Sequence, residues 1–425
     1  MKKYIVKGGK ELNGRVKISG SKNAALPVLA ATLLTDDTVT LHNIPILRDT
    51  QTMFSLLAVL GKKVIINNGA VVIKTEKKNR YKATYDIVKQ MRASIVVLGP
   101  LLAKRRKAHV SLPGGCAFGP RPVDLHIKGL RKLDARITFH HGYIDARASR
   151  LQGNEINLAG EFGSSVLATD NVIMAASLAD GKTVIESAAR EPETQDLINF
   201  LKAMGADISG SGTSVVTVNG VSRLHGCEYT VISDRIEAGT FLGLAALNKK
   251  EIKIRFEQQQ HIENILDLLK EIGVKITTKG NWISVKGGRA NKYKNFKVTT
   301  LPYPDFPTDM QAVMTVVASF IPGICTISEN IYPNRFNHVP ELNRMGANIR
   351  IEKNTAIIHQ ASSLEGASVQ ASDLRAGAAL VIAALKAQGT SEVRRIYHIE
   401  RGYEDFHKKL KTLGADIDVG SDSLI

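Results

Sequence analysis

The segment from Ser111 to Leu125, SLPGGCAFGPRPVDL, carries a thiol, Cys116, and a guanidinium five residues later, Arg121. Its many glycine and proline residues cannot continue a helix or a central strand, so we expect a loop. A thiol and a guanidinium on such a loop indicate a segment that brings reactive groups to a site formed elsewhere. An ordinary surface loop with a free cysteine would have the same composition.

Three further cations, Lys22, Arg92 and Arg375, lie near the starts of apolar segments. The helix dipole disfavours a cation at a helix N-terminus, so another interaction must stabilise the cation there. An anionic ligand would supply it, because helix N-termini bind anions and the arginine fork binds phosphate and carboxylate. Asp309 also lies at such a start, where an aspartate can simply cap the helix.

The apolar segments themselves recur six times and are polar only near their starts. Helices that are apolar on every face must be buried. A strand-forming run follows each of them. The six segments are residues 21–34, 90–103, 164–179, 234–247, 308–320 and 372–385.

A second pattern recurs with the same period of about 70 residues. It is an apolar pair at positions i and i+3, which marks the last turn of an amphipathic helix, followed by a residue expected in the left-handed conformation and then by a strand. Each unit is therefore predicted as buried helix, strand, amphipathic helix and two strands. The residues expected in the left-handed conformation are Gly61, Asp134, Gly205, Gly273, Gly346 and Gly414.

Six such units predict two α/β domains of three units each, residues 21–232 and residues 1–20 with 233–425. The strand expected within residues 1–20 would close the last unit of the second domain. A chain of 425 residues is long enough for two cores, and its 44% hydrophobic and 23% charged residues are those of a soluble globular protein.

Composition also limits the compartment and the partners. No apolar run reaches the length of a membrane span, and the N-terminus lacks the apolar core of a signal peptide. Three cysteines without a CxxC pair favour reduced thiols in a cytoplasmic protein, with neither a disulfide framework nor a metal site. The net charge of +17 suits an anionic partner, but only 5% of residues are aromatic. No basic run is interleaved with aromatics, so general surface basicity is favoured over nucleic-acid binding.

Nine stretches of the sequence together resemble the enolpyruvyl transferases that act on UDP-N-acetylglucosamine, and they span nearly the whole chain in family order. The resemblance implies two inside-out α/β domains, each of three βαβαββ-type repeats around buried helices, with the active site in the cleft between them. The stretches are SGSKNAALP (19–27), QMRASI (90–95), LPGGCAFGPRPVDLH (112–126), AAREPE (188–193), SDRIEAGT (233–240), FPTDMQA (306–312), NRFNHVPEL (334–342), DLRAGA (373–378) and RIYHIERGYE (395–404).

The reaction that this resemblance implies joins phosphoenolpyruvate to the sugar 3-hydroxyl of UDP-N-acetylglucosamine and releases phosphate, as the first committed step of peptidoglycan synthesis. It needs a general acid, a general base and cations around phosphate and carboxylate. By resemblance, Cys116 is the acid at C3 of phosphoenolpyruvate and Asp309 is the base at the sugar hydroxyl. Lys22, Arg121 and Arg401 would hold phosphoenolpyruvate.

The resemblance also assigns the remaining substrate contacts. Arg92, Arg335 and Arg375 would add positive field, Asn23 would lie between the two substrates, and Ile331 would line the sugar pocket. The uridine and diphosphate would lie against Arg121, Pro122, Val123, Asp124 and Leu125, and against Gly163, Ser164, Ser165 and Val166 at a helix N-terminus. No cofactor, metal, nucleic acid or membrane is expected, and the expected state is a monomer.

Two other interpretations stay open from the sequence. A related enolpyruvyl transferase could use another acceptor, such as shikimate 3-phosphate or a different nucleotide, although the cysteine of the LPGGC stretch argues against the shikimate enzyme. A basic repeat scaffold that binds nucleic acid would show no turnover, and its binding would weaken steeply with salt.

Overall fold

The computed structural model describes residues 2–112, 123–161 and 163–421. The chain divides into two compact units, a discontinuous unit (Met1–Ser19 with Ser233–Ile425) and a continuous unit (Gly20–Ile232). The division expected from the sequence differs from these bounds by one residue at its first boundary. No helix in the described ranges combines the length and the apolar character needed to cross a membrane.

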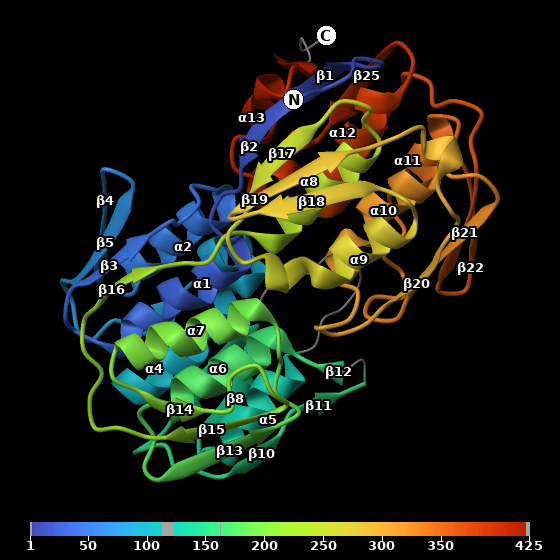
Figure 1. Ribbon diagram of the computed structural model, residues 1–425. Coiled ribbons are helices and arrows are strands. Elements are labelled where there is room, and N and C mark those ends of the chain that lie inside the picture. The colour runs from blue at the N-terminus through green and yellow to red at the C-terminus, as the bar shows by residue number, and fades with distance from the viewer. Residues whose placement is uncertain (1, 113–122, 162, 422–425) are drawn as a thin grey trace. The chain divides into compact units, whose positions relative to one another are not determined.

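One sheet topology recurs through the described part of both units, in six four-stranded sheets (Figure 1). In each sheet one edge strand runs parallel to its neighbour, and the other two neighbouring pairs are antiparallel. The repeated α/β unit predicted from the sequence is therefore confirmed.

The continuous unit contains three of these sheets and a two-stranded hairpin. The sheets are β16-β3-β5-β4 (Glu228–Thr230, Val39–His42, Ala70–Thr75, Lys62–Asn67), β6-β7-β9-β8 (Lys82–Ala83, Lys107–Ser111, Tyr143–Arg147, Arg136–His140) and β10-β13-β15-β14 (Glu155–Asn157, Lys182–Glu186, Val215–Asn219, Asp207–Ser209), and the hairpin is β11-β12 (Ala159–Gly160, Gly163–Ser164). Its helices are α1 (Lys22–Ala31), η1 (Thr32–Leu34), α2 (Arg48–Val59), α3 (Tyr85–Val88), η2 (Arg92–Val97), α4 (Leu98–Arg105), α5 (Asp124–Lys132), α6 (Val166–Ala176) and α7 (Pro192–Ala203).

The discontinuous unit contains the other three sheets. They are β18-β19-β17-β2 (Lys275–Lys279, Trp282–Lys286, Ile252–Arg255, Gly14–Lys17), β20-β21-β23-β22 (Lys297–Thr300, Ile324–Glu329, Thr355–His359, Asn348–Glu352) and β24-β25-β1-β26 (Ser368–Gln370, Thr390–Arg394, Lys2–Lys7, Asp416–Ser421). Its helices are α8 (Arg235–Ala246), η3 (Gln259–Ile262), α9 (Glu263–Glu271), η4 (Ala290–Lys292), η5 (Thr308–Met310), α10 (Gln311–Ala318), α11 (Val339–Arg344), α12 (Leu374–Lys386), η6 (Ile396–Arg401) and α13 (Phe406–Thr412).

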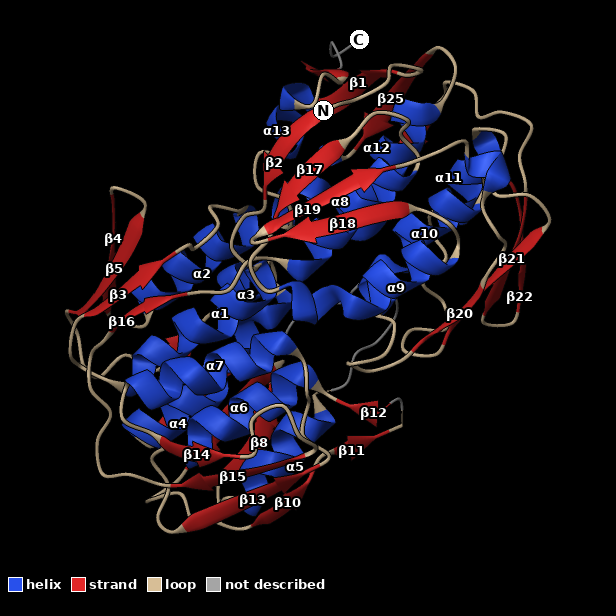
Figure 2. Ribbon diagram, in the orientation of Figure 1, coloured by secondary structure: helices blue, strands red, loops and turns tan. Residues whose placement is uncertain are grey.

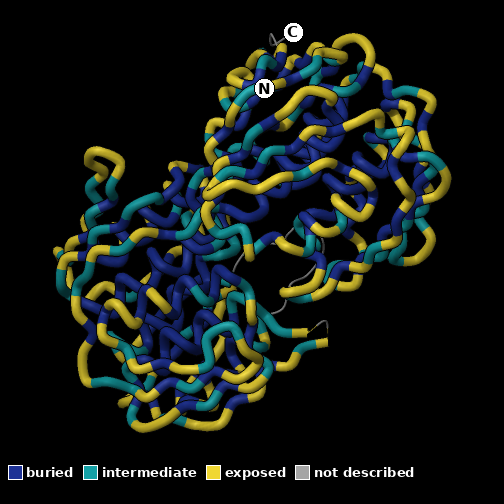
Figure 3. The backbone as a smooth tube through the Cα atoms, viewed as in Figure 1, coloured by how far each residue is buried: buried dark blue, intermediate teal, exposed yellow. Residues whose placement is uncertain are grey.

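Within each unit the apolar helices lie inside and the sheets lie outside, as Figures 2 and 3 show. All twelve residues of α8 are buried, and so are eight of the ten residues of α1. A helix with no polar face can be stable only if other elements cover it on all sides. The sheets and the other helices provide this cover, and each unit has its own hydrophobic core.

The second, third and sixth buried helices begin two residues later than the sequence predicts. The second begins as the 3₁₀ helix η2 at Arg92 and the sixth, α12, begins at Leu374, whereas the fifth begins at Thr308 as predicted but as the 3₁₀ helix η5. The third begins at Val166 and not at residue 164, because Gly163 and Ser164 pair with β11. The expectation of polar residues only near the starts is wrong for α6, which buries a polar run in its middle, Thr169, Asp170 and Asn171.

The first strands of the chain serve two sheets. As expected, β1 closes the last unit, where it pairs with β25 on one side and β26 on the other. In contrast, β2 joins the sheet of β17, and β16 joins the sheet of β3. The chain therefore passes between the units twice, and the two crossings lie side by side: Ser21 N donates to Ile232 O, and Asp234 N donates to Ser19 O, both at 2.8 Å.

All six residues predicted in the left-handed conformation adopt it. Their φ angles lie between +67° and +107°, with the lowest value at Asp134, the one residue of the six that is not glycine. Such angles strain any residue with a Cβ atom, and aspartate tolerates them better than most. The repeat read from the sequence therefore corresponds to six repeated helix ends.

We expect Gly414→Ala to destabilise the protein by about 1–2 kcal/mol, because φ is +90° while no neighbour lies within 4 Å of the added Cβ. The loss of stability then comes from backbone strain at a positive φ and not from a clash of the added Cβ. Gly288→Ala is the matched control, since φ there is not positive and the nearest atom to the added Cβ is 3.7 Å away. Urea unfolding followed by circular dichroism measures both variants. Equal stability of the two variants would contradict the conformational explanation.

Candidate active site

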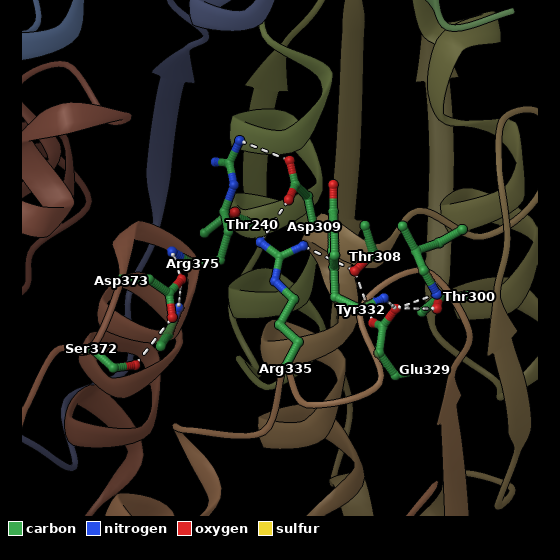
Figure 4. Close-up of polar contacts among 12 residues, drawn as sticks. Thr240, Thr300, Thr308, Asp309, Glu329, Tyr332, Arg335, Ser372, Asp373 and Arg375 are labelled. Carbon is green, nitrogen blue, oxygen red and sulfur yellow. Dashed lines mark hydrogen bonds and ion pairs between the residues drawn. The ribbon is translucent and has the colours of Figure 1, made fainter. Parts of the chain in front are cut away.

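A carboxylate held by two buried guanidinium groups forms the centre of the site in the discontinuous unit (Figure 4). Asp309 Oδ1 lies 2.7 Å from Arg335 Nη2, and Asp309 Oδ2 lies 3.4 Å from Arg375 Nη2. The side chains of Arg335 and Arg375 are 7% and 2% exposed, whereas that of Asp309 is 26% exposed. The fold thus brings together three residues that the sequence analysis selected, with the carboxylate as the most accessible of the three.

Each partner is positioned by its own local structure. Asp309 lies in η5, directly before α10, and Arg375 lies in the first turn of α12. Asp373 caps α12, because its Oδ1 accepts from the backbone N–H of Arg375 at 2.8 Å and of Ala376 at 3.1 Å. Arg335 follows β21 in a turn where its N–H donates to Tyr332 O at 2.8 Å. Two helix starts and one turn therefore supply the cluster.

The electrostatics of the cluster favour the ionised guanidinium groups. Burial alone would lower the pKa of Arg335, but the carboxylates of Asp309 and Asp373 outweigh it and raise that pKa. For Arg375, burial also acts to lower the pKa, and the nearby Tyr403 and Asp309 raise it above its usual value. Both arginines therefore remain cations although they are buried.

Some buried polar groups of Arg375 and of Gln311 have no hydrogen-bond partner among the described residues. Among the described residues, Nε and Nη1 of Arg375 find no acceptor, and the side-chain amide of Gln311 at the start of α10 has no partner. A buried donor without an acceptor costs free energy, so such groups are rare in a purely structural setting. Sequence analysis did not select Gln311, although it belongs to the FPTDMQA stretch.

Arg401 and Ile331 belong to the same unit. Arg401 ends η6, and a Cβ atom added to the next residue, Gly402, would come within 2.2 Å of Leu374 at the start of α12. The end of η6 therefore packs against the helix start that carries Arg375. Ile331 follows β21, and its N–H donates to Glu329 Oε1 at 2.9 Å.

In the continuous unit, Lys22 and Asn23 form the first turn of α1, which Ser21 caps by accepting from Ala24 N at 3.3 Å. Lys22 Nζ lies 3.7 Å from Asp49 Oδ2, and the Asp49 side chain is 5% exposed. The buried carboxylate of Asp49 thus partly compensates for the unfavourable interaction between Lys22 and the helix dipole. Asp49 could not be predicted from the sequence, because no pattern connects α2 with the start of α1.

A buried polar network connects α6 with η2, α4 and α5. Asn171, inside α6, donates from Nδ2 to Ile95 O and to His126 Nδ1, both at 3.0 Å, and its Oδ1 accepts from Gly99 N at 2.6 Å. Burial, and then the charge of Arg92, lowers the pKa of His126 to about 3. The network ties α5 to the η2–α4 junction, and its signal in the sequence is the polar run inside an apolar helix.

The two segments predicted to hold the nucleotide are neighbours. Val123, Asp124 and Leu125 form the start of α5, and a Cβ atom on Gly160 of β11 would lie 3.0 Å from Leu125 Cδ1. Gly160 pairs with Gly163 in β12. The expectation that residues 163–166 all lie at a helix N-terminus is wrong for the first two.

Gly163 and Ser164 form β12, while Ser165 caps α6 and Val166 is its first residue. The Ser165 hydroxyl accepts from Ala168 N at 3.4 Å. The strand forms because Gly163 adopts a φ of +98°, which turns the chain back toward β11. Cys116, Arg121 and Pro122 lie outside the described residues.

Comparison with known proteins identifies the family of this fold. A family model described as EPSP synthase (3-phosphoshikimate 1-carboxyvinyltransferase) matches residues 6–410. The fold is also that of the enolpyruvyl transferase NikO from Streptomyces tendae, with a TM-score of 0.91 at 21% identity over 99% of both chains. EPSP synthase from Acinetobacter baumannii gives a TM-score of 0.76 at 18% identity over 99% of this chain and 100% of its own. The chain therefore belongs to the enolpyruvyl transferase family.

Curated relatives within this family are much more similar in sequence. The UDP-N-acetylglucosamine 1-carboxyvinyltransferase of Methylacidiphilum infernorum is 50% identical over 417 residues, 98% of each chain. The protein of the same name from Idiomarina loihiensis is 50% identical over 420 residues, 98% of this chain and 99% of its own. The resemblance found in the sequence motifs is thus confirmed over the full length.

We expect His126→Gln to change how stability depends on pH. The folded-state pKa of about 3 lies below the ordinary value of 6.5, so between these values the unfolded state binds more protons. The neutral histidine therefore contributes stability that is present above pH 6.5 and is lost as pH falls toward 3, whereas glutamine does not titrate. The stability advantage of the wild type over the variant, from urea unfolding at several pH values, should shrink across this window. A constant difference would contradict a buried, neutral His126.

Proposed function

We propose that this chain transfers the enolpyruvyl group of phosphoenolpyruvate to the 3-hydroxyl of UDP-N-acetylglucosamine and releases phosphate. The sugar hydroxyl adds to C2 while C3 gains a proton, and the resulting tetrahedral ketal then loses phosphate and a C3 proton. The observation that carries the proposal is the Arg335–Asp309–Arg375 cluster in a chain that is 50% identical over 98% of its length to a transferase named for this reaction.

Asp309 is the proposed base at the sugar hydroxyl. A base must expose its carboxylate to the substrate, and Asp309 is the most accessible member of its cluster, at 26% of its side chain. Arg335 and Arg375 keep their charges and would stabilise negative charge as it develops. The donors of Arg375 that lack protein acceptors would bind an anionic ligand group.

The remaining roles follow the family motifs. Cys116 would protonate C3, and Lys22, Arg121 and Arg401 would hold phosphoenolpyruvate, with Arg92 adding positive field. Lys22 keeps an acidic neighbour, Asp49, which holds the ammonium group near the start of α1. Asn23 would lie between the substrates, and Ile331 would line the sugar pocket.

The nucleotide would lie against two adjoining segments, residues 121–125 and 163–166. Their adjacency through Leu125 and β11 supports a single binding surface. The N-terminus of α6 offers backbone N–H groups to a diphosphate. The alternative is a related transferase with a different acceptor, which the fold of NikO and of EPSP synthase also supports.

We also propose a compartment, an oligomeric state and a cellular role for the enzyme. We expect a cytoplasmic monomer without metal or cofactor that commits UDP-N-acetylglucosamine to peptidoglycan, and hence to the cell wall, cell shape and division. Its basic surface, with a net charge of +17, would attract two anionic substrates.

Phosphate release from phosphoenolpyruvate tests the function. We expect turnover with UDP-N-acetylglucosamine as acceptor and none with shikimate 3-phosphate. Turnover with shikimate 3-phosphate alone would favour the alternative acceptor class. Binding of nucleic acid that weakens steeply with salt, with no turnover on either acceptor, would favour the scaffold interpretation.

We expect the epoxide fosfomycin to alkylate Cys116 selectively, because thiolates open epoxides and the other thiols are poor nucleophiles. Burial raises the pKa of Cys227 and of Cys325, so both remain protonated at neutral pH. Mass spectrometry of the intact protein should show one adduct, and Cys116→Ser should show none and should lose turnover by orders of magnitude. An adduct that persists in Cys116→Ser would disprove the assignment.

A further inference from the structure

Glu329 is a fully buried carboxylate on which four hydrogen bonds converge, at the end of β21 (Figure 4). Its Oε1 accepts from the Thr300 hydroxyl at 2.7 Å and from the backbone N–H groups of Ile331 and Tyr332, both at 2.9 Å. Its Oε2 accepts from the Thr308 hydroxyl at 2.8 Å. None of the roles assigned above uses this residue, although it adjoins both Ile331 and η5.

The Glu329 carboxylate accepts all four hydrogen bonds, and this fixes which atom donates in each contact from Glu329 to Arg335. A hydroxyl has one proton, so Thr308, which donates to Glu329, can only accept from its other neighbour. That neighbour is Arg335, whose Nη1 donates to Thr308 Oγ1 at 2.9 Å while its Nη2 contacts Asp309 at 2.7 Å. The guanidinium is thereby anchored at both terminal nitrogens.

We propose that Glu329 is a positioning residue for the transfer reaction. One of its carboxylate oxygens orients Asp309 through Thr308 and Arg335, and the other holds the backbone that carries Ile331. This inference rests on the proposed function, in which Asp309 acts as the base and Ile331 lines the sugar pocket. A single buried group would then align the base with the sugar that it deprotonates.

The geometry explains why this anchor should affect the rate. Without Thr308, Arg335 would keep its contact with Asp309 and its place 5.8 Å from the centre of the Tyr332 ring, but it would lose the Nη1 contact that helps to fix the guanidinium plane. Asp309 would move with it, and a displacement of about 1 Å of a reacting group can cost roughly a hundredfold in rate. A carboxylate that only stabilises the turn after β21 would affect stability and leave the rate of the folded enzyme unchanged.

The test compares two threonines whose hydroxyls each donate to a buried carboxylate, the half-buried Thr308 and the buried Thr194. Thr308→Val removes the hydroxyl between Glu329 and Arg335, and Thr194→Val removes a hydroxyl that donates to the buried Asp170, also at 2.8 Å, in the continuous unit. We expect Thr308→Val to lower kcat by roughly ten- to a hundredfold while KM for UDP-N-acetylglucosamine changes less than threefold. Thr194→Val should lower the melting temperature by a similar amount and keep kcat within twofold.

Two conservative variants separate positioning from folding. Thr308→Ser keeps the hydroxyl and should restore kcat to within about threefold of the wild type. Glu329→Gln keeps the shape but presents an amide donor where an acceptor is needed, so kcat should fall as in Thr308→Val. Each rate is expressed per folded protein, measured by circular dichroism at the assay temperature.

The outcomes distinguish this inference from the proposed function. A wild-type chain that releases no phosphate with UDP-N-acetylglucosamine would overturn both. Wild-type turnover together with a normal kcat in Thr308→Val would overturn the positioning role alone. A Thr308→Ser variant as slow as Thr308→Val, or a Thr194→Val variant that loses kcat equally, would also overturn it, since the effect would then not depend on the Thr308 hydroxyl.

Discussion

The complete burial of apolar helices is the constraint on which the rest of the structure depends. A helix such as α8, with no exposed residue, offers no side on which a polar group can reach solvent. The charged residues selected for the chemistry lie at helix starts, as Lys22, Asp309 and Arg375 do. The positive end of the helix dipole at these starts favours anions. Core and site are thus two results of one packing requirement.

The Arg335–Asp309–Arg375 cluster shows an electrostatic compromise. Buried guanidinium groups need a nearby carboxylate, since an unpaired buried charge is strongly destabilising. The two cations in turn hold the carboxylate in a fixed place. In the proposed role of Asp309 as the base, that fixed orientation is what the Glu329 contacts would maintain.

Much of this architecture could be predicted from the sequence because it rests on local patterns. Apolar runs identified the buried helices, and the glycine period identified six helix ends, including the aspartate at position 134. The pairing of β2 with β17 and of β16 with β3 could not be predicted, since a short strand does not indicate which sheet it will join. Likewise, Asp49, His126 and Glu329 acquire partners only when distant segments meet. The third buried helix was predicted to begin at residue 164, but it begins at Val166. The prediction failed because a glycine–serine pair can begin a helix or end a hairpin equally well.

The position of β1 has a consequence for how the protein forms during synthesis. Residues 2–7 are synthesised long before both of their neighbours in the sheet, β25 and β26. Until then this strand has two unsatisfied edges, and such edges invite pairing with other chains. Its sequence, KKYIVK, places lysines at both ends. These charges would repel other nascent chains until β25 and β26 have been made, so the lysines of β1 would aid assembly as well as solubility.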